Sequence, residues 1–365
     1  MSKLAIPSSR KSIVPSEQRY IGDYASGRSN NFDFLRLLAA ALVIFSHAYA
    51  VANDRGASEP LIVYTHGKMA FGTLAVDLFF IMSGFLITAS FVRSKSHAIF
   101  WKARILRIFP GLVAAVIFTA FVLGPIVTSL PVRDYLLGSG PYRYLGTVSL
   151  WWQPSLPGVF EKNPLPAVNG SLWTLVPELW CYLTVAAMGS VRLLRKWVIG
   201  IVCVAILTSS WFAPHAYEHV RGPWQTYLYF LRMFSFGVLF YLFRDRIPLD
   251  GRYAAVAAVG LVVSNYVGLL DVAFTPLCAY LVFYLAYSPR LKLNDFARRG
   301  DFSYGTYIYA FPVQQAVTHF FGGRMEPWLN FAISLPIVMV LAFASWHIVE
   351  SRCIRLKNVR IFGII

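Results

Sequence analysis

The chain has 365 residues, of which 57% are hydrophobic and 14% are charged, and its mean hydropathy is +0.56. A soluble domain of this length does not tolerate such a composition, so the chain is predicted to be an integral membrane protein. The net charge of +16 would suit nucleic-acid binding, but the positions of the basic residues argue against that function.

About ten apolar windows are long enough to cross a bilayer as helices, which requires roughly 17–25 residues each. In residue numbers they are 33–52, 72–92, 108–130, 173–190, 197–213, 224–243, 253–269, 272–287, 303–321 and 328–349. We therefore expect an all-α polytopic integral membrane protein without room for a sizeable soluble domain. The predicted transmembrane domain covers 31–350, between a basic tail at 1–30 and a short basic tail at 351–365.

Lysine and arginine are distributed unevenly between the two sides of this predicted bundle. If the N-terminus is cytosolic, the opposite side holds only Arg55, Lys68, Arg133, Arg143, Lys162, Arg221 and Arg324. Nearly all the others lie in the tails and connections of the cytosolic side, as the positive-inside rule requires. We expect both termini in the cytosol, membrane lipids as partners of the basic residues, and no nucleic-acid partner.

The first 30 residues are polar and basic and lack the apolar core of a cleaved signal peptide, so we expect a loosely ordered tail. The four cysteines, Cys181, Cys203, Cys278 and Cys353, form no Cys-x-x-Cys pair. They suggest neither a disulfide framework nor a zinc site.

The first apolar window contains two ionisable residues, Arg36 and His47. Such groups are costly inside a membrane, by about 2.5 kcal/mol or more for an arginine near the centre, and they usually mark function. Their spacing puts both side chains on one helix face, about 16 Å apart. A lone histidine on an apolar helix more often has a structural role, and the aligned arginine argues against that role.

The second window contains Asp77, which is either a charge inside the membrane or a residue at its outer boundary. The cytosolic connection that follows carries Lys102, Arg104 and Arg107. Arg104 and Arg107 are close on one helix face and could bind one polyanion together. The alternative is a topology anchor that contacts lipid phosphates.

The longest loop precedes the fourth window on the outer side and is rich in proline and aromatic residues, including Trp151 and Trp152. Trp173 follows where the loop ends. Long ordered loops often bind ligands, and aromatic faces suit stacking on sugar rings. An aromatic belt at the membrane interface is the alternative.

Glu178 places a carboxylate in the fourth window, with Thr174 and Tyr182 one turn away on the same helix face. A charged group at this position is either functional or part of a structural ion pair, for example with Arg232 of the sixth window.

Short patterns occur in order along the chain. They are the Arg36–His47 spacing, Val76-Asp77-x-Phe79-Phe80-x-x-Ser83-Gly84-Phe85, Arg104-x-x-Arg107, Ser171-Leu-Trp-Thr-Leu-x-x-Glu178, Ser303-Tyr304-Gly-x-Tyr307 and Val349-Glu350. The ordered set resembles the type-3 acyltransferase family, membrane-bound enzymes that acylate bacterial surface glycans and other extracytoplasmic acceptors. One departure is Ala310, which stands where relatives usually carry a histidine.

The resemblance implies a multi-pass protein of the bacterial inner (cytoplasmic) membrane. Its donor would be cytosolic acyl-CoA, most often acetyl-CoA, and it would need no metal. The acceptor would be a hydroxyl of an extracytoplasmic glycan such as an exopolysaccharide, an O-antigen or a lipo-oligosaccharide. The acyl group, the acceptor and the oligomeric state stay open.

For the donor, we expect Arg104, Arg107 and Lys102 to bind the CoA phosphates at the cytosolic mouth. The pantetheine arm would then pass Arg36. His47 would act as a general base on the acceptor hydroxyl or as a nucleophile that carries the acyl group.

For the acceptor, we expect contacts from Trp151, Trp152, Trp173 and Asp77. Glu178 would orient either the histidine or the acceptor hydroxyl.

The competing class is a transporter that moves acyl groups, lipid-linked sugars or small anions without chemistry. Ionisable residues inside the membrane fit that class too, but the chain has no inverted repeat with paired broken helices. His215 and His219 have a spacing that can hold a metal, but no third ligand is evident, so we expect no metal there.

Overall fold

A computed structural model describes residues 19–25, 30–212, 223–288, 291, 293, 296 and 300–359. This described part of the chain is built from helices and contains no strand, only two isolated bridges that join Tyr20 to Pro248 and Thr128 to Val159. The predicted all-α membrane fold is therefore confirmed.

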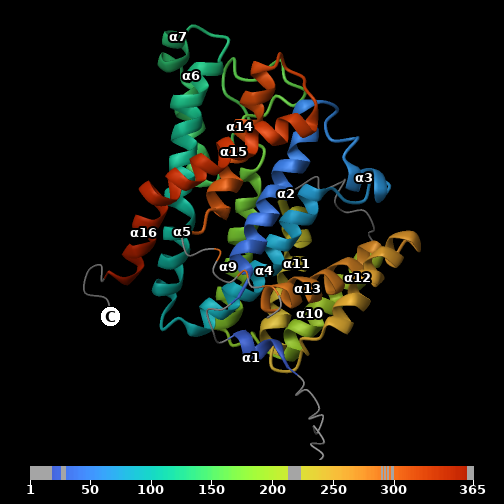
Figure 1. Cartoon of the computed structure of the whole chain (residues 1–365). Helices are drawn as coiled ribbons and strands as arrows, with labels where there is room; N and C mark the ends of the chain where they lie inside the picture. Colours follow the sequence, from blue (N-terminus) through green and yellow to red (C-terminus); the bar gives the residue numbers. More distant parts are fainter. Residues whose placement is uncertain are drawn as a thin grey trace, which may run out of the picture.

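Each apolar window of the sequence coincides with a helix (Figure 1). The long helices are α2 (Phe32–Ala52), α4 (Phe71–Arg93), α5 (His97–Ile117), α9 (Leu175–Ser190), α10 (Lys196–Phe212), α11 (Pro223–Phe243), α12 (Gly251–Tyr266), α13 (Leu270–Tyr287), α14 (Ser303–Phe320) and α15 (Pro327–Ser345).

Short helices continue or connect the long ones. They are α1 (Ile21–Ala25), α3 (Pro60–Tyr64), η1 (Phe118–Leu123), α6 (Gly124–Val127), α7 (Val132–Leu137), α8 (Gly140–Tyr144), η2 (Leu145–Ser149), η3 (Leu172–Thr174), η5 (Trp346–Glu350), α16 (Ser351–Arg355) and η6 (Leu356–Asn358). In Figure 1, α1 lies at one end of the bundle and α7 at the other.

Among the described residues, 7 helical segments are long and apolar enough to cross a membrane. They are Phe32–Ala52, Phe71–Arg93, His97–Val127, Leu172–Ser190, Trp224–Phe243, Leu270–Tyr287 and Pro327–Arg355. The remaining predicted spans form α10, α12 and α14, which are shorter or less apolar. The number of crossings and the side on which the termini lie stay predictions.

The central helix of the bundle is α14, and its enclosure explains its lower hydropathy. It packs against α2, α5 and α15, and its residues are buried without a break from Gly305 to Thr318. Gln314 Nε2 donates to Ile44 O on α2 (2.7 Å) and to Asn330 Oδ1 on α15 (3.0 Å). A helix that is covered on all sides by protein can carry such polar residues because they find partners there.

Helices α4 and α11 cross at very short range. A Cβ atom on Gly84 would lie 2.0 Å from Phe234 O, and one on Gly237 would lie 2.1 Å from Ile81 O. Small residues allow the backbones of membrane helices to approach in this way. The glycine pair therefore holds the face of α4 in the position from which it lines the site.

Part of the predicted N-terminal tail packs against the bundle. Ile21 is buried, and its N–H donates to Ile247 O (3.0 Å), while the N–H of Gly22 donates to Arg244 O (2.8 Å). Residues 19–25 of the predicted tail are thus part of the bundle, because an apolar residue and two backbone donors find partners after α11. Residues 1–18 lie outside the described residues.

Candidate active site

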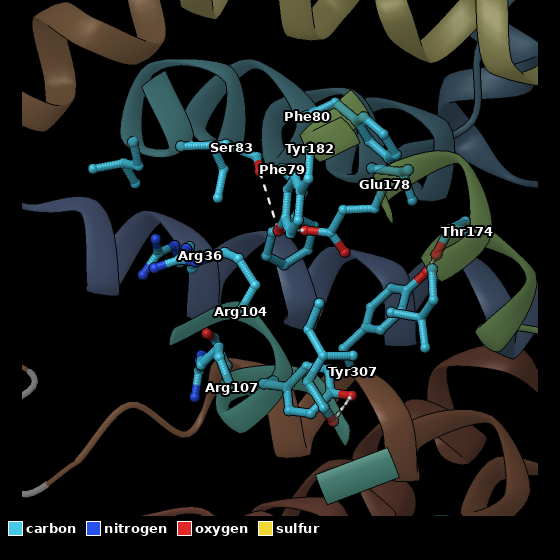
Figure 2. Close-up of a pocket in the computed structure, with 17 residues that line it drawn as sticks. Arg36, Phe79, Phe80, Ser83, Arg104, Arg107, Thr174, Glu178, Tyr182 and Tyr307 are labelled. Atoms are coloured by element: carbon cyan, nitrogen blue, oxygen red, sulfur yellow. Dashed lines mark hydrogen bonds between the residues drawn. The ribbon is translucent and has the colours of Figure 1, made fainter. Parts of the chain in front are cut away.

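A cavity of about 150 Å³ lies inside the bundle, between α2, α4, α5, α9 and α14. Four of the predicted site residues line it, namely Arg36, Arg104, Arg107 and Glu178. The other lining residues are Val76, Phe79, Phe80, Ser83, Leu86, Ile87, Ile108, Thr174, Leu175, Tyr182, Ser303, Tyr304 and Tyr307. Figure 2 shows the arginines on one side of the cavity, Glu178 in the middle and Thr174 on the far side.

Two of the three arginines are already paired with carboxylates. Arg107 binds Asp301 (Nη2 to Oδ2, 2.6 Å) and Glu350 (Nη1 to Oε2, 3.4 Å). Arg36 Nη1 lies 3.2 Å from Asp33 Oδ1 and 3.6 Å from Asp301 Oδ2. Asp301 therefore connects α2 to α5 at the arginine end of the cavity.

Asp301 lies in the connection before α14, and its pKa reports these contacts. Burial acts to raise the pKa of this carboxyl, but the guanidinium groups of Arg107 and Arg36 and the hydrogen bonds from Ser303 outweigh it. The pKa of Asp301 consequently lies below its usual range. The carboxylate is charged at neutral pH and holds both arginines.

Arg104 differs from its two neighbours. Among the described residues its side chain makes no hydrogen bond or ion pair, and its Nε is buried without a partner. Buried guanidinium groups usually bind carboxylate, phosphate or another acceptor. Arg104 is therefore a cation that can bind an anionic ligand in the cavity.

Glu178 is bonded within its own helix rather than to an ion-pair partner on α11. Tyr182 donates a short hydrogen bond to Glu178 Oε1, and Ser83 Oγ lies 3.5 Å from the same phenol oxygen. The charges that act on this carboxylate come from Arg104, Arg36 and Arg107.

Arg232, the alternative partner of Glu178, points elsewhere. Its Nε donates to Thr275 Oγ1 on α13 (2.9 Å), and its charge acts on Asp77. The carboxylate of Glu178 therefore faces the arginines of the cavity.

His47 lies on α2 as predicted, but it is not among the residues that line the cavity. Its ring is half-buried and meets the ring of Phe311 edge-on, with centroids 5.1 Å apart. Its Nδ1 is buried without a hydrogen-bond partner. No hydrogen bond joins His47 to Glu178, which lines the cavity while His47 does not, so the Nδ1 of His47 is available to a ligand.

Helices α2 and α14 run in the same direction, which places His47 relative to the cavity. Arg36 lies beside Asp301 at the start of both helices, and Gln314 donates to the carbonyl of Ile44 farther along both. His47 therefore lies beyond the cavity, on the side away from the arginines.

Comparison with known proteins identifies the family. Residues 29–347 match the family described as Acyltransferase domain. The chain belongs to this acyltransferase family. The predicted resemblance is thereby confirmed, and acyl transfer in a membrane is favoured over transport without chemistry.

This acyltransferase matches two relatives over nearly the whole length of each. The chain is 30% identical over 330 residues to an O-acetyl transferase of Shigella phage Sf6, covering 89% of this chain and 96% of the relative. It is 30% identical over 364 residues to Nodulation protein 10 of Rhizobium leguminosarum bv. viciae, covering 92% and 96%. Protein 2 in picA locus of Rhizobium radiobacter is 26% identical over 170 residues, which is 42% of this chain and 88% of that protein. No solved structure gives a significant match.

The predicted acceptor residues of the acyltransferase do not line the arginine-bearing cavity. Trp151 is exposed, whereas Trp152 donates its indole N–H to Asn169 O (2.8 Å). Trp152 and Trp173 instead line a second cavity of about 410 Å³, together with Val176, Pro177, Trp180, Trp224, Thr226 and Tyr227.

Asp77 and Lys102 also lie away from the arginine-bearing cavity. Asp77 is fully buried and accepts a hydrogen bond from Tyr229 on α11 (2.9 Å), so it is not exposed at the membrane boundary. Lys102 Nζ donates to Val359 O near the C-terminus (2.5 Å). Both residues connect elements of the bundle.

Sequence reasoning missed Asp301 as the carboxylate that binds two site arginines. The sequence contained only a weak indication of this role, because Asp301 lies in a basic connection and a single acidic residue there fits an ordinary exposed loop. Glu350 belongs to the last family pattern, but nothing in the sequence joins it to Arg107.

The structure does not describe the two histidines with metal-ligand spacing. His215 and His219 lie outside the described residues. Within the described ranges, no group of three or more His, Cys, Asp or Glu side chains could hold a metal ion.

Proposed function

We propose that the chain is an O-acyltransferase that moves an acyl group, in the first place acetyl, from acyl-CoA to a hydroxyl of an extracytoplasmic glycan. The observation that carries the proposal is the unpaired guanidinium of Arg104 in a cavity whose far side leads toward His47. The proposal is supported by family membership and by the printed name of the phage relative, an O-acetyl transferase.

The donor would enter from the arginine side of the cavity. CoA phosphates suit arginine because the guanidinium donates paired hydrogen bonds to phosphate oxygens. Arg104 would supply the main contact, since Arg107 and Arg36 already bind carboxylates. Lys102, two residues before Arg104 on α5, would add positive charge at the same end.

The chemistry requires one base and no redox partner. His47 would take the proton of the acceptor hydroxyl, whose oxygen attacks the thioester carbonyl. The carbon–sulfur bond breaks, a carbon–oxygen bond forms, and the CoA thiolate receives the proton. If His47 instead carries the acyl group first, the products are the same ester and thiol.

The acceptor would approach from the opposite side of the membrane. The exposed ring of Trp151 lies in the loop at that end of the bundle and offers a stacking surface for a sugar. The membrane would be the bacterial inner membrane, with the arginine side of the cavity facing the cytosol, as the distribution of basic residues predicts.

The test replaces His47 by asparagine, whose amide cannot take a proton. We expect O-acylation of the cell's surface glycans, measured by mass spectrometry, to fall by about a hundredfold or more, the usual contribution of a general base. His66→Asn is the matched control, because His66 is exposed in a loop. Wild-type acylation in His47→Asn, at matched protein level, would remove His47 from the mechanism.

A further inference from the structure

Two hydroxyl groups meet at the far side of the cavity, which Thr174 and Tyr307 line. Thr174 Oγ1 and the Tyr307 hydroxyl oxygen are 2.6 Å apart, and both residues are buried. Both hydroxyls also lie within hydrogen-bond distance of Ser171 O, at 3.1 Å from Thr174 and 2.9 Å from Tyr307. The two hydroxyl protons can serve two of these three contacts at a time.

The cluster is held in place from the loop side. Asn169 Nδ2 donates to Ile308 O on α14 (3.0 Å), and Asn169 Oδ1 accepts from the N–H of Ser171 (3.0 Å). Gly170 packs closely against the ring of Phe311, since a Cβ atom there would be 2.5 Å from a ring carbon. The segment 169–174, which carries Thr174, therefore packs against α14, which carries Tyr307.

The cluster lies between the cavity and His47. Tyr307 and Phe311 are four residues apart on α14, which is about 6 Å of helical rise. Tyr307 lines the cavity, whereas Phe311 contacts the ring of His47. Phe79 packs edge-on against Tyr307, with centroids 5.8 Å apart, and covers the ring from α4.

We infer that Thr174 and Tyr307 form the barrier that the acyl group must pass to reach His47, and that this barrier selects short acyl groups. The inference rests on the proposed function. A cavity of about 150 Å³ is small for a ligand site, since such sites usually measure about 300–1,000 Å³. The Tyr307 side chain must move for the thioester to pass, and a longer acyl chain requires a larger displacement.

The test measures release of CoA thiol from acetyl-CoA, butyryl-CoA and hexanoyl-CoA by membranes that contain the full chain and the cell's own glycans. We expect the wild type to prefer acetyl-CoA over hexanoyl-CoA by about tenfold or more, because one methylene group in a tight pocket can change the reaction rate by that factor. Tyr307→Ala should reduce this ratio to near one, because it removes the ring from the passage.

Thr174→Val keeps the shape of the side chain but removes its hydroxyl, so the Tyr307 ring is no longer held by Thr174. We expect the same ratio to fall about threefold, a partial loss of the discrimination that the full barrier provides. Thr184→Val is the matched control, because Thr184 Oγ1 and the Tyr227 hydroxyl are also 2.6 Å apart but Thr184 does not line the cavity.

The outcomes separate this inference from the proposed function. A wild type without chain-length preference, or an unchanged ratio in both Tyr307→Ala and Thr174→Val, would overturn the barrier. If Tyr307→Ala does not fold, the ratio in Thr174→Val against Thr184→Val decides. No thiol release from any acyl-CoA by the wild type would refute the proposed donor, and the barrier that rests on it.

Discussion

At the arginine end of the cavity, three identical side chains have different surroundings. Arg107 binds two carboxylates, Arg36 lies beside two, and Arg104 has no partner among the described residues. Removing one member of a buried ion pair destabilises the fold, whereas an unpaired cation in a cavity is available to a ligand. We therefore propose that, of the predicted pair, Arg104 binds the ligand and Arg107 has a structural role.

This division predicts opposite effects of two alanine substitutions. Arg104→Ala should raise the KM for acyl-CoA by about tenfold to a hundredfold, the value of hydrogen bonds to a charged group, with an unchanged Tm. Arg107→Ala should lower the free energy of unfolding by about 3 kcal/mol or more, because Asp301 and the buried Glu350 both lose a cationic partner. Donor kinetics and thermal unfolding of the purified protein measure both effects, and equal effects of the two substitutions would contradict the division.

Other single residues show where sequence reasoning ends. The spacing of Arg36 and His47 placed them on one helix, because helical geometry is local. It did not show that Arg36 lines the cavity while His47 lies beyond it, since this depends on distant parts of the chain: Asp301 before α14 and Phe311 on α14.

At the scale of elements, the crossing of α4 and α11 depends on having no side chain at two positions. Gly84 and Gly237 allow backbone atoms of the two helices to meet, and Tyr229 on α11 reaches Asp77 on α4 nearby. Asp77, predicted to contact the acceptor, is thus part of the contact between these helices.

The crossing predicts that Gly84→Ala destabilises the protein. The added methyl group would lie 2.0 Å from Phe234 O, so the helices must separate, at a cost of about 1–3 kcal/mol of unfolding free energy. Gly200→Ala on α10 is the control, because no atom lies within 4 Å of the added Cβ and alanine favours helix. A lower Tm for Gly84→Ala but not for Gly200→Ala is expected in detergent, and equal Tm values would show that the crossing adapts.

At the scale of the whole molecule, the orientation in the membrane decides which side supplies the donor. The segment His97–Val127 is one continuous helical unit of 31 residues, about 46 Å at helical rise, so the connections before and after it lie at opposite ends. The distribution of basic residues predicts that the end with Lys95 is cytosolic and the end with Leu137 is outside.

Cysteine labelling tests this orientation. In a Cys353→Ser background the other native cysteines are buried, so Leu137→Cys and Lys95→Cys introduce exposed thiols. We expect a membrane-impermeant maleimide to label Leu137→Cys in intact cells and Lys95→Cys only after permeabilisation. The reverse pattern would invert the topology and place the arginine end of the cavity outside the cytosol.

The sequence by itself determined the membrane class, the positions of the helices and the family. Hydropathy and helical period are sums over neighbouring residues, so the apolar windows coincide with helices even where one of them, α14, lies at the centre of the bundle. The order of the short patterns likewise needs no tertiary information.

Only the tertiary structure decided which charged and polar side chains contact one another. Arg107 joins residues 301 and 350, and Thr174 joins Tyr307, across more than a hundred residues of chain in each case. Such pairs depend on how α5, α9, α14 and η5 pack, and no local pattern encodes that packing. The arrangement of the helices alone decides that Arg104 has no partner in the described part of the chain while Arg36 and Arg107 bind carboxylates. It also decides that His47 lies outside the cavity.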